Sequence, residues 1–446
     1  MNDHPASPRS ISVVSTLNHS FSHLRLARSA FVLGSFALAL VATGAPAQPS
    51  PATAKELKAA TKAVEQNKLD EAERIFSAIA MREPSEVRAK LGLADIAYRE
   101  GRFQESELII RQAVADFSKD PGVHVALGRF LYAQKRFKEA EDALISAREL
   151  EDAAYIDVDL GTLYAEALDR PVDAMDYFYR AIAKDPKLPG AHYALGQVLF
   201  SQNQFDEARA QFEIVVRLDS KNVFGWIGMG RSQVRAGRPY AAVMAYEKAA
   251  QLAPKSFLIT LERADLDTAL GKDEAALRGY EEAVKLDPKS FSAWSKLGMF
   301  HQVHSHLADA DAAYAKALAI DPKSALVLNN RAALALAGFG HISDGIPLAK
   351  QAVELSPDNP YFLDTLGELL EKNGQLDEAR RVLTTARQAD PKYLAPRYHL
   401  AIVLHRQGKI AEARALLEEP LKGDHAFPER ADFEKLLAKI NASPAK

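Results

Sequence analysis

The chain has 446 residues, of which 48% are hydrophobic and 26% are charged, and its formal net charge is −3. This charge, without clustered Lys and Arg, argues against a nucleic acid or an anionic membrane surface as the partner, because both are bound by dense positive charge. The sequence contains no cysteine. Disulfides, thiolate catalysis, iron–sulfur clusters and cysteine-ligated zinc are therefore excluded.

The N-terminal segment has the layout of a secretory signal peptide. Arg28 ends a polar lead, an uncharged apolar stretch covers residues 30–43, and Ala45 and Ala47 stand where signal peptidase reads small residues. The apolar stretch is shorter than the about 20 residues that span a bilayer. We therefore expect residues 1–47 to be removed, with an uncleaved signal anchor as the alternative. The mature protein is then periplasmic or secreted and has no integral membrane span.

From residue 84 onward, the sequence repeats with a period of about 34 residues, which is typical of helical repeats. A helix-ending position recurs at this spacing, with one interval longer by a single residue, at Pro84, Ser118, Asp152, Pro186, Ser220, Pro254, Pro288, Pro322, Pro357 and Pro391. A fixed period of this length indicates a solenoid, in which each repeat packs only on its neighbours. The length of the chain therefore does not set a number of globular domains.

Each period has the same plan of small, aromatic and turn residues. Small residues stand where two helices of a repeat would touch, for example Gly298, Ala276 and Ala283. An aromatic residue that fills the adjacent space recurs at Phe76, Phe178, Phe212, Tyr246, Tyr280 and Tyr314. The turn between the helices needs a left-handed residue, and Gly or Asn occupies it at Asn67, Gly101, Asn203, Gly237, Gly271, Gly374 and Gly408. We expect Asp70, Asp206 and Asp377 to cap the second helices.

In its small, aromatic and proline positions the pattern resembles the tetratricopeptide repeat. The resemblance implies an all-α fold, an α-solenoid superhelix of about eleven helix-turn-helix repeats over residues 53–427. We expect residues 48–52 to be a short lead and residues 428–446 to cap the exposed end of the solenoid. The fourth repeat is interpreted as carrying an extra residue before its second helix. The ninth carries an inserted residue, three glycines and Pro347.

The sequence contains no motif that indicates a catalytic site. The sequence has no Gly-x-Ser-x-Gly elbow, no His-Glu-x-x-His pair and no phosphate-binding loop. Paired carboxylates such as Asp265 and Asp267 stand two residues apart on a predicted helix, so their side chains point to different sides. We therefore predict that the protein is not an enzyme and has no cofactor.

His301, His304 and His306 form a cluster at the end of a predicted helix. Imidazoles at this spacing can bind zinc or copper. A histidine near a helix C-terminus also interacts favourably with the helix dipole. The sequence leaves both interpretations open, and we assign no metal ligand from it.

The resemblance further implies where partners bind, because in this family the first helices of the repeats line a concave face. Mapping that face onto the repeat predicts a partner-binding groove of aromatic, basic and amide side chains. Its residues are Tyr98, Arg129, Tyr132, Tyr193, Gln197, Arg231, Arg235, Asp265, Asn329, Asn330, Tyr361 and Tyr398. Tyr and Arg are types that anchor protein interfaces.

These observations predict a non-catalytic protein–protein interaction scaffold of the bacterial envelope. Its partners would be other envelope proteins, in polysaccharide export, outer-membrane biogenesis or secretion. The alternative is a polysaccharide-binding solenoid, or the targeting subunit of a glycosyltransferase-type enzyme complex. The groove offers Tyr but no Trp for stacking on sugars, which leaves the polysaccharide alternative open.

Overall fold

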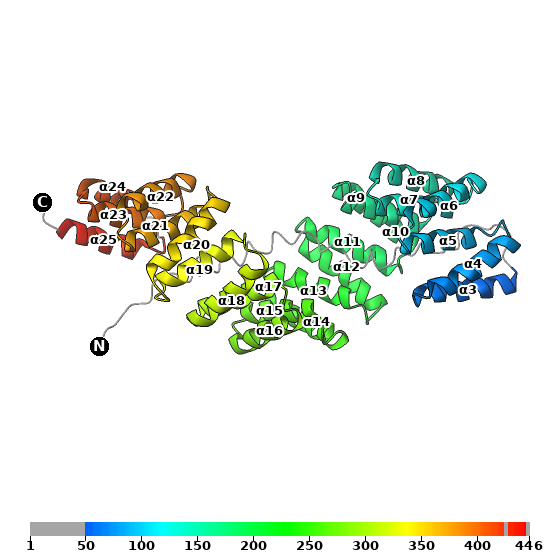
Figure 1. Ribbon diagram of the computed structural model, residues 1–446, viewed down its shortest axis with the longest axis horizontal. Coiled ribbons are helices and arrows are strands. Elements are labelled where there is room, and N and C mark those ends of the chain that lie inside the picture. Colours follow the sequence, from blue (N-terminus) through cyan, green and yellow to red (C-terminus); the bar gives the residue numbers. More distant parts are fainter. Residues whose placement is uncertain (1–49, 423–426, 443–446) are drawn as a thin grey trace. The chain divides into compact units, whose positions relative to one another are not determined.

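The computed structural model describes residues 50–422 and 427–442 (Figure 1). Within these ranges it contains 23 helices and no strand, which confirms the predicted all-α solenoid. The chain divides into two compact units, one up to residue 254 and one from residue 255. The predicted signal peptide over residues 1–47 lies outside the described residues.

The first unit, up to residue 254, is a stack of six helix pairs. The pairs are α3 (Pro51–Glu65) with α4 (Leu69–Arg82), α5 (Val87–Arg99) with α6 (Phe103–Asp116), α7 (Pro121–Ala133) with α8 (Phe137–Leu150), α9 (Ala154–Glu166) with α10 (Pro171–Lys184), α11 (Pro189–Ser201) with α12 (Phe205–Leu218), and α13 (Val223–Arg235) with α14 (Pro239–Leu252). Because α3 begins at Pro51, with the Ser50 hydroxyl accepting a hydrogen bond from the Thr53 amide, residues 51 and 52 belong to the first helix rather than to the predicted lead.

The second unit, from residue 255, has five helix pairs and one further helix. The pairs are α15 (Phe257–Ala269) with α16 (Asp273–Leu286), α17 (Phe291–Val303) with α18 (Leu307–Ile320), α19 (Ala325–Leu336) with α20 (Ile342–Leu355), α21 (Pro360–Lys372) with α22 (Leu376–Ala389), and α23 (Ala395–Arg406) with α24 (Ile410–Leu421). The further helix, α25 (Arg430–Ala442), buries Phe433 and Ile440 completely in the core that the last pairs form. It therefore covers apolar surface that the last pair would otherwise expose.

The turns inside the pairs follow the period of the sequence. A residue with positive φ recurs once per period at Asn67, Gly101, Lys135, Asp169, Asn203, Gly237, Gly271 and Ser305. Asp169 keeps this spacing, so the interpretation of an extra residue in the fourth repeat is wrong. The next positive-φ turn residue of the series is Gly340, which lies one position later than the period requires, and Gly338 is also left-handed. The inserted residue of the ninth repeat therefore lies in the turn between α19 and α20.

The helix caps differ from the sequence prediction. The residues that precede the second helices are Lys68, Gln204 and Gln375, whereas Asp70, Asp206 and Asp377 lie in the first turn of those helices. The turn needs only one residue between the left-handed position and the helix, so the helix begins earlier than the capping pattern suggested. In the first turn an Asp carboxylate still interacts favourably with the helix dipole.

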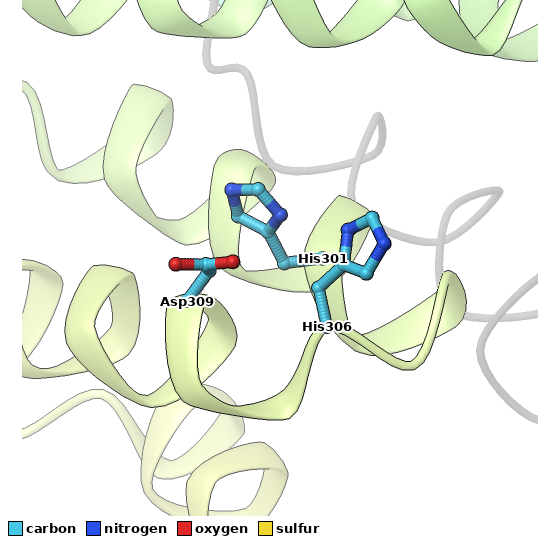
Figure 2. Close-up of side chains that lie close together, drawn as sticks. All are labelled: His301, His306 and Asp309. Atoms are coloured by element: carbon cyan, nitrogen blue, oxygen red, sulfur yellow. The ribbon is translucent and has the colours of Figure 1, made fainter.

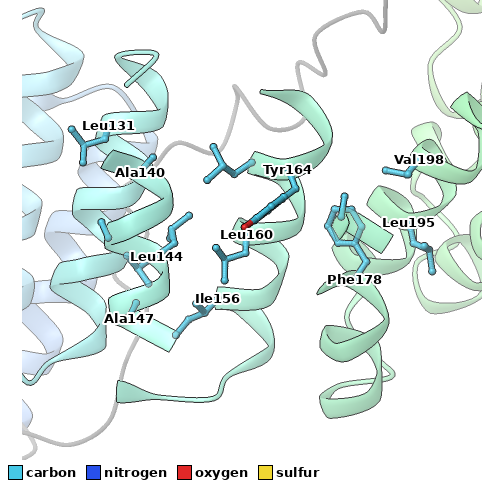
Figure 3. Close-up of a cluster of buried hydrophobic side chains, with 14 of the residues drawn as sticks. Leu131, Ala140, Leu144, Ala147, Ile156, Leu160, Tyr164, Phe178, Leu195 and Val198 are labelled. Atoms are coloured by element: carbon cyan, nitrogen blue, oxygen red, sulfur yellow. The ribbon is translucent and has the colours of Figure 1, made fainter. Parts of the chain in front are cut away.

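Close approach of helices depends on glycine facing an aromatic ring. A Cβ added to Gly161 would stand 2.6 Å from the Phe178 ring, and one added to Gly298 would stand 2.6 Å from the Tyr314 ring. Figure 3 shows part of the core of the first unit, in which Leu160 of α9 is one of the buried hydrophobic side chains.

No helix within residues 50–422 and 427–442 combines the length and apolar character needed to cross a membrane.

Candidate partner-binding face

The predicted groove residues all lie on the first helices of their pairs. In the first unit they are Tyr98 on α5, Arg129 and Tyr132 on α7, Tyr193 and Gln197 on α11, and Arg231 and Arg235 on α13. In the second unit they are Asp265 on α15, Asn329 and Asn330 on α19, Tyr361 on α21 and Tyr398 on α23. We call these residues the first-helix face, and each unit carries its own part of it.

Polar residues of the first-helix face bind the next first helix along the chain. Arg129 Nε donates a hydrogen bond to Asp159 Oδ2 at 2.9 Å, and these residues stand 30 positions apart. Tyr132 Oη donates to Glu166 Oε2 at 2.7 Å over 34 positions. Both bonds join α7 to α9. These two bonds hold consecutive helix pairs in register. They also engage the Arg129 and Tyr132 donors, which the sequence analysis had assigned to a binding partner.

The second unit has the same kind of link. Asp265 on α15 accepts a hydrogen bond from Tyr280 Oη at 2.9 Å and pairs with the Lys296 ammonium on α17. Burial raises the pKa of the Asp265 carboxyl, and the Lys296 charge opposes this shift. On the last two pairs, His399 Nδ1 lies 2.7 Å from Asp364 Oδ1, so α21 and α23 are joined as well.

Other residues of the face are only partly available. Tyr98 lies in edge contact with Phe103 at a ring separation of 5.2 Å, and Tyr193 lies 5.7 Å from the Phe212 ring. Burial raises the pKa of both Tyr98 and Tyr193. Tyr398 lies 5.5 Å from the Phe433 ring of α25. All three tyrosines are half-buried, so part of each side chain packs within the solenoid.

The amides and the remaining basic residues of the face are placed differently. Asn329 is buried, with 9% of its surface exposed and no hydrogen-bond partner for its Oδ1. Asn330, Gln197 and Arg231 are half-buried. Arg235 is exposed and lies over the Phe205 ring at 5.0 Å. The cation–π contact with the Phe205 ring therefore positions the exposed Arg235 guanidinium.

Tyr361 is the most exposed tyrosine of the first-helix face in the second unit. Its surface is 41% exposed, and its ring lies 4.6 Å from that of Tyr393. Packing on Tyr393 orders one face of the Tyr361 ring and leaves the rest in solvent. An ordered, half-exposed aromatic costs little conformational entropy on binding and is a favourable anchor for a partner.

Sequence reasoning missed the partners of the first-helix face, namely Asp159, Glu166 and Lys296, and the similar contact of His399 with Asp364. A signal for them was present, because each stands 30 to 35 positions after the residue it contacts. Complementary groups that stand about one period apart lie on neighbouring first helices. Several residues of the first-helix face therefore link neighbouring repeats.

We expect these links to stabilise the solenoid measurably. A double-mutant cycle of Arg129→Met and Asp159→Asn should give a coupling of about 1.5–3 kcal/mol, because the pair is hydrogen-bonded and only 17% and 19% exposed. Burial raises the pKa of Asp159 against the Arg129 charge, so the unpaired carboxylate is costly. The matched cycle on Arg238 and Asp206, which are 45% and 65% exposed, should give only about 0.2–1 kcal/mol. Equal couplings in urea unfolding would contradict this assignment.

The fold defines a helical-repeat protein in which stacked first helices line up the residues of the first-helix face within each unit. A tetratricopeptide repeat family model matches residues 97–157, 165–222, 336–391 and 372–440, which together make up half of the chain. A second tetratricopeptide repeat model matches residues 57–121, and a TPR repeat model matches residues 264–302. The chain belongs to the tetratricopeptide repeat family.

Three curated relatives match parts of this chain. The chain is 28% identical over 195 residues to protein O-mannosyl-transferase TMTC1 of Homo sapiens, covering 43% of this chain and 22% of that protein. It is 25% identical over 362 residues to cellulose synthase operon protein C of Pseudomonas fluorescens, covering 73% of this chain and 25% of that protein. It is 25% identical over 145 residues to type IV pilus assembly protein PilF of Pseudomonas aeruginosa, covering 31% and 56%. The chain therefore spans between 22% and 56% of the length of these relatives.

Proposed function

We propose that this protein is a non-catalytic scaffold of the bacterial envelope that binds partner proteins along its first-helix face. The observation that carries the proposal is the face itself: stacked first helices that present ordered, exposed anchors such as Arg235 and Tyr361. Aromatic and Arg side chains of this kind dominate the energetics of protein interfaces. The family to which the chain belongs supports a role in protein interaction.

The envelope location is part of the proposal. Its support is the predicted signal peptide over residues 1–47, together with two Pseudomonas relatives named for a cellulose synthase operon and for type IV pilus assembly. A protein placed in the periplasm or secreted would meet envelope proteins in polysaccharide export, outer-membrane biogenesis or secretion. We do not propose one of these processes over the others.

A second candidate function is binding of a polysaccharide, or targeting of a glycosyltransferase-type complex. Two of the relatives are named for glycan synthesis, a mannosyl-transferase and a cellulose synthase operon protein. The packed pair of Tyr361 and Tyr393 offers a sugar ring a stacking platform. The same residues thus serve either candidate, and the test must separate a protein ligand from a glycan.

In-cell photocrosslinking tests the leading proposal. A photoreactive amino acid placed at Tyr361, on first helix α21, should capture a reproducible set of envelope proteins. The same amino acid at Ala312, an exposed position of second helix α18, is the matched control and should capture far less. Mass spectrometry identifies what is captured.

Three results would count against the protein scaffold. Equal capture at Tyr361 and Ala312 would exclude the first-helix face as the binding surface. Capture of cytoplasmic proteins alone would exclude the envelope. Absence of protein capture together with co-sedimentation on an insoluble polysaccharide, lost in Tyr361→Ala, would favour the second candidate.

A further inference from the structure

The turn between α17 and α18 gathers two imidazoles and a carboxylate. His301 lies in the last turn of α17, His306 directly precedes α18, and Asp309 lies in the first turn of α18. One potential ligand atom from each of the three lies within 4.8 Å of the other two. Figure 2 shows the three side chains at the junction of the two helices.

The backbone of the turn holds the two imidazoles in place. The His306 amide donates a hydrogen bond to the His301 carbonyl at 2.9 Å, and the Ser305 amide donates to the Gln302 carbonyl at 3.1 Å. Ser305 takes the left-handed conformation with φ 61°. This is the bonding of a Schellman ending, so the separation of His301 and His306 is set by regular structure and not by a loose loop.

The His301 ring has a polar group without a protein partner. His301 is only 9% exposed, and its Nδ1 is buried without a hydrogen bond. A buried unsatisfied nitrogen is costly and calls for a ligand or a role. Burial lowers the pKa of His301, against the opposing charge of Asp309. Burial thus favours the neutral imidazole, which is the form that binds a metal.

At the position of His306 most other repeats carry a cation, although the ninth repeat carries His341, and at the position of His301 no other repeat carries a histidine. The residue that precedes the second helix is a cation in seven other repeats, at Lys68, Arg102, Arg136, Arg170, Arg238, Lys272 and Lys409. Four of these cations pair with a carboxylate three positions on, as Arg102 does with Glu105 at 2.6 Å. The position of His301 holds a buried leucine in four other repeats, at Leu131, Leu199, Leu370 and Leu404.

The eighth repeat thus keeps the carboxylate, Asp309, and carries histidine both where most repeats have a cation and where the other repeats have leucine, alanine or, at Gln233 and Asp267, another polar residue. Neither histidine improves packing: a buried imidazole needs partners that a leucine does not need. Together they create a set of two imidazoles and one carboxylate, which suits zinc and its neighbours among the transition metals.

We propose that His301, His306 and Asp309 bind a single zinc ion. Ligand atoms around a tetrahedral zinc stand about 3.3 Å apart, given bond lengths of about 2.0–2.1 Å. The ligand atoms of the three residues lie within 4.8 Å of one another, so their separations have to shorten by up to about 1.5 Å. Rotation of the exposed His306 and Asp309 side chains provides this change. Three protein ligands leave a fourth position for water or for a side chain of a bound partner.

His304 lies beside the set and is engaged elsewhere. Its Nδ1 lies 2.8 Å from the Phe300 carbonyl, its Nε2 lies 3.1 Å from Asp273 Oδ2, and its ring stacks on Phe300 at 4.1 Å. The structure therefore replaces the three-histidine cluster of the sequence by a set in which Asp309 takes the place of His304.

Isothermal titration of the full chain with zinc chloride tests the proposal, with two variants that introduce residues carried by other repeats. We expect one zinc ion per chain for the unaltered protein. His306→Arg introduces the cation that most repeats carry and its pairing with Asp309, and His301→Leu introduces the core residue that four other repeats carry. Each should weaken zinc binding at least tenfold without lowering the melting temperature, so loss of binding cannot be confused with loss of the fold.

The ninth repeat supplies a matched control. His341 precedes α20 and Asp344 follows three residues later, but Ala335 stands where the second imidazole would be. His341→Arg should therefore leave zinc binding unchanged, as should His304→Gln. Cobalt(II) in place of zinc should give the absorption of a tetrahedral nitrogen and oxygen site, absent in His306→Arg. No heat from the unaltered protein, or unchanged affinity in both His306→Arg and His301→Leu, would overturn the proposal.

Discussion

Replacing Ala317 by Glu is expected to destabilise the second unit by about 3–5 kcal/mol, enough to unfold part of it. Ala317 lies on α18, is fully buried and packs in one cluster with Tyr314 and Val327. The helices meet there over a methyl group, so the longer side chain has no room. Its carboxylate would also be buried without a partner, which costs far more than the lost methyl contacts.

The measurement is thermal and urea unfolding followed by circular dichroism. Ala312→Glu is the matched control, because it places the same side chain at an exposed position of the same helix. We expect that variant to change the free energy of unfolding by no more than about 0.5 kcal/mol. Similar losses in Ala317→Glu and Ala312→Glu would mean that the assigned buried face of α18 is wrong.

Replacing Gly228 by Ala is expected to destabilise the first unit by about 1–3 kcal/mol, although alanine is the better helix former. The added Cβ would stand 2.7 Å from the Phe212 ring, which is itself fully buried. The Phe212 ring cannot shift away from Gly228 either, because it already packs closely on the other first helix: a Cβ at Gly196 would stand 2.8 Å from the same ring. The ring cannot move away from one first helix without meeting the other.

Gly190→Ala provides the control for helix propensity. Gly190 lies in the first turn of α11, and nothing stands within 4 Å of an added Cβ. That variant should be neutral or more stable by up to about 1 kcal/mol. In the double variant Gly228→Ala and Phe212→Leu, the smaller side chain should relieve the clash, so the combined loss should be less than the sum. If the losses in free energy of unfolding of the two single variants simply added in the double variant, Gly228 and Phe212 would not be in direct contact.

The turns show how far local signals reach. Gly and Asn recurring once per period predicted the left-handed positions correctly at Gly101 and Asn203, because these residues accept positive φ at low cost. Ser305 and Lys135 adopt the same conformation with side chains that favour it less. At these two turns the packing of the flanking helices imposes a backbone that the residue itself does not prefer.

The first-helix face shows where local sequence signals stop being informative. The period placed Arg129 and Tyr132 on a first helix, as the structure has them. It did not reveal that Asp159 and Glu166 take up their donors, since that depends on how the side chains of one repeat reach the next. The same holds for Asp309, which joins His301 and His306 only because the Schellman turn brings the first turn of α18 back beside the end of α17.

By itself, the sequence determined the repeat: its period, its helix pairs and the positions of its small, aromatic and turn residues. These features are local and recur, so each copy of the pattern supports the same interpretation. The tertiary structure alone decided which polar side chains pair across repeats and which stay exposed. Those contacts depend on side-chain conformations at the seam between neighbouring helices, where residues 30 to 35 positions apart meet. The conformational preference of neither residue by itself determines whether their side chains come into contact.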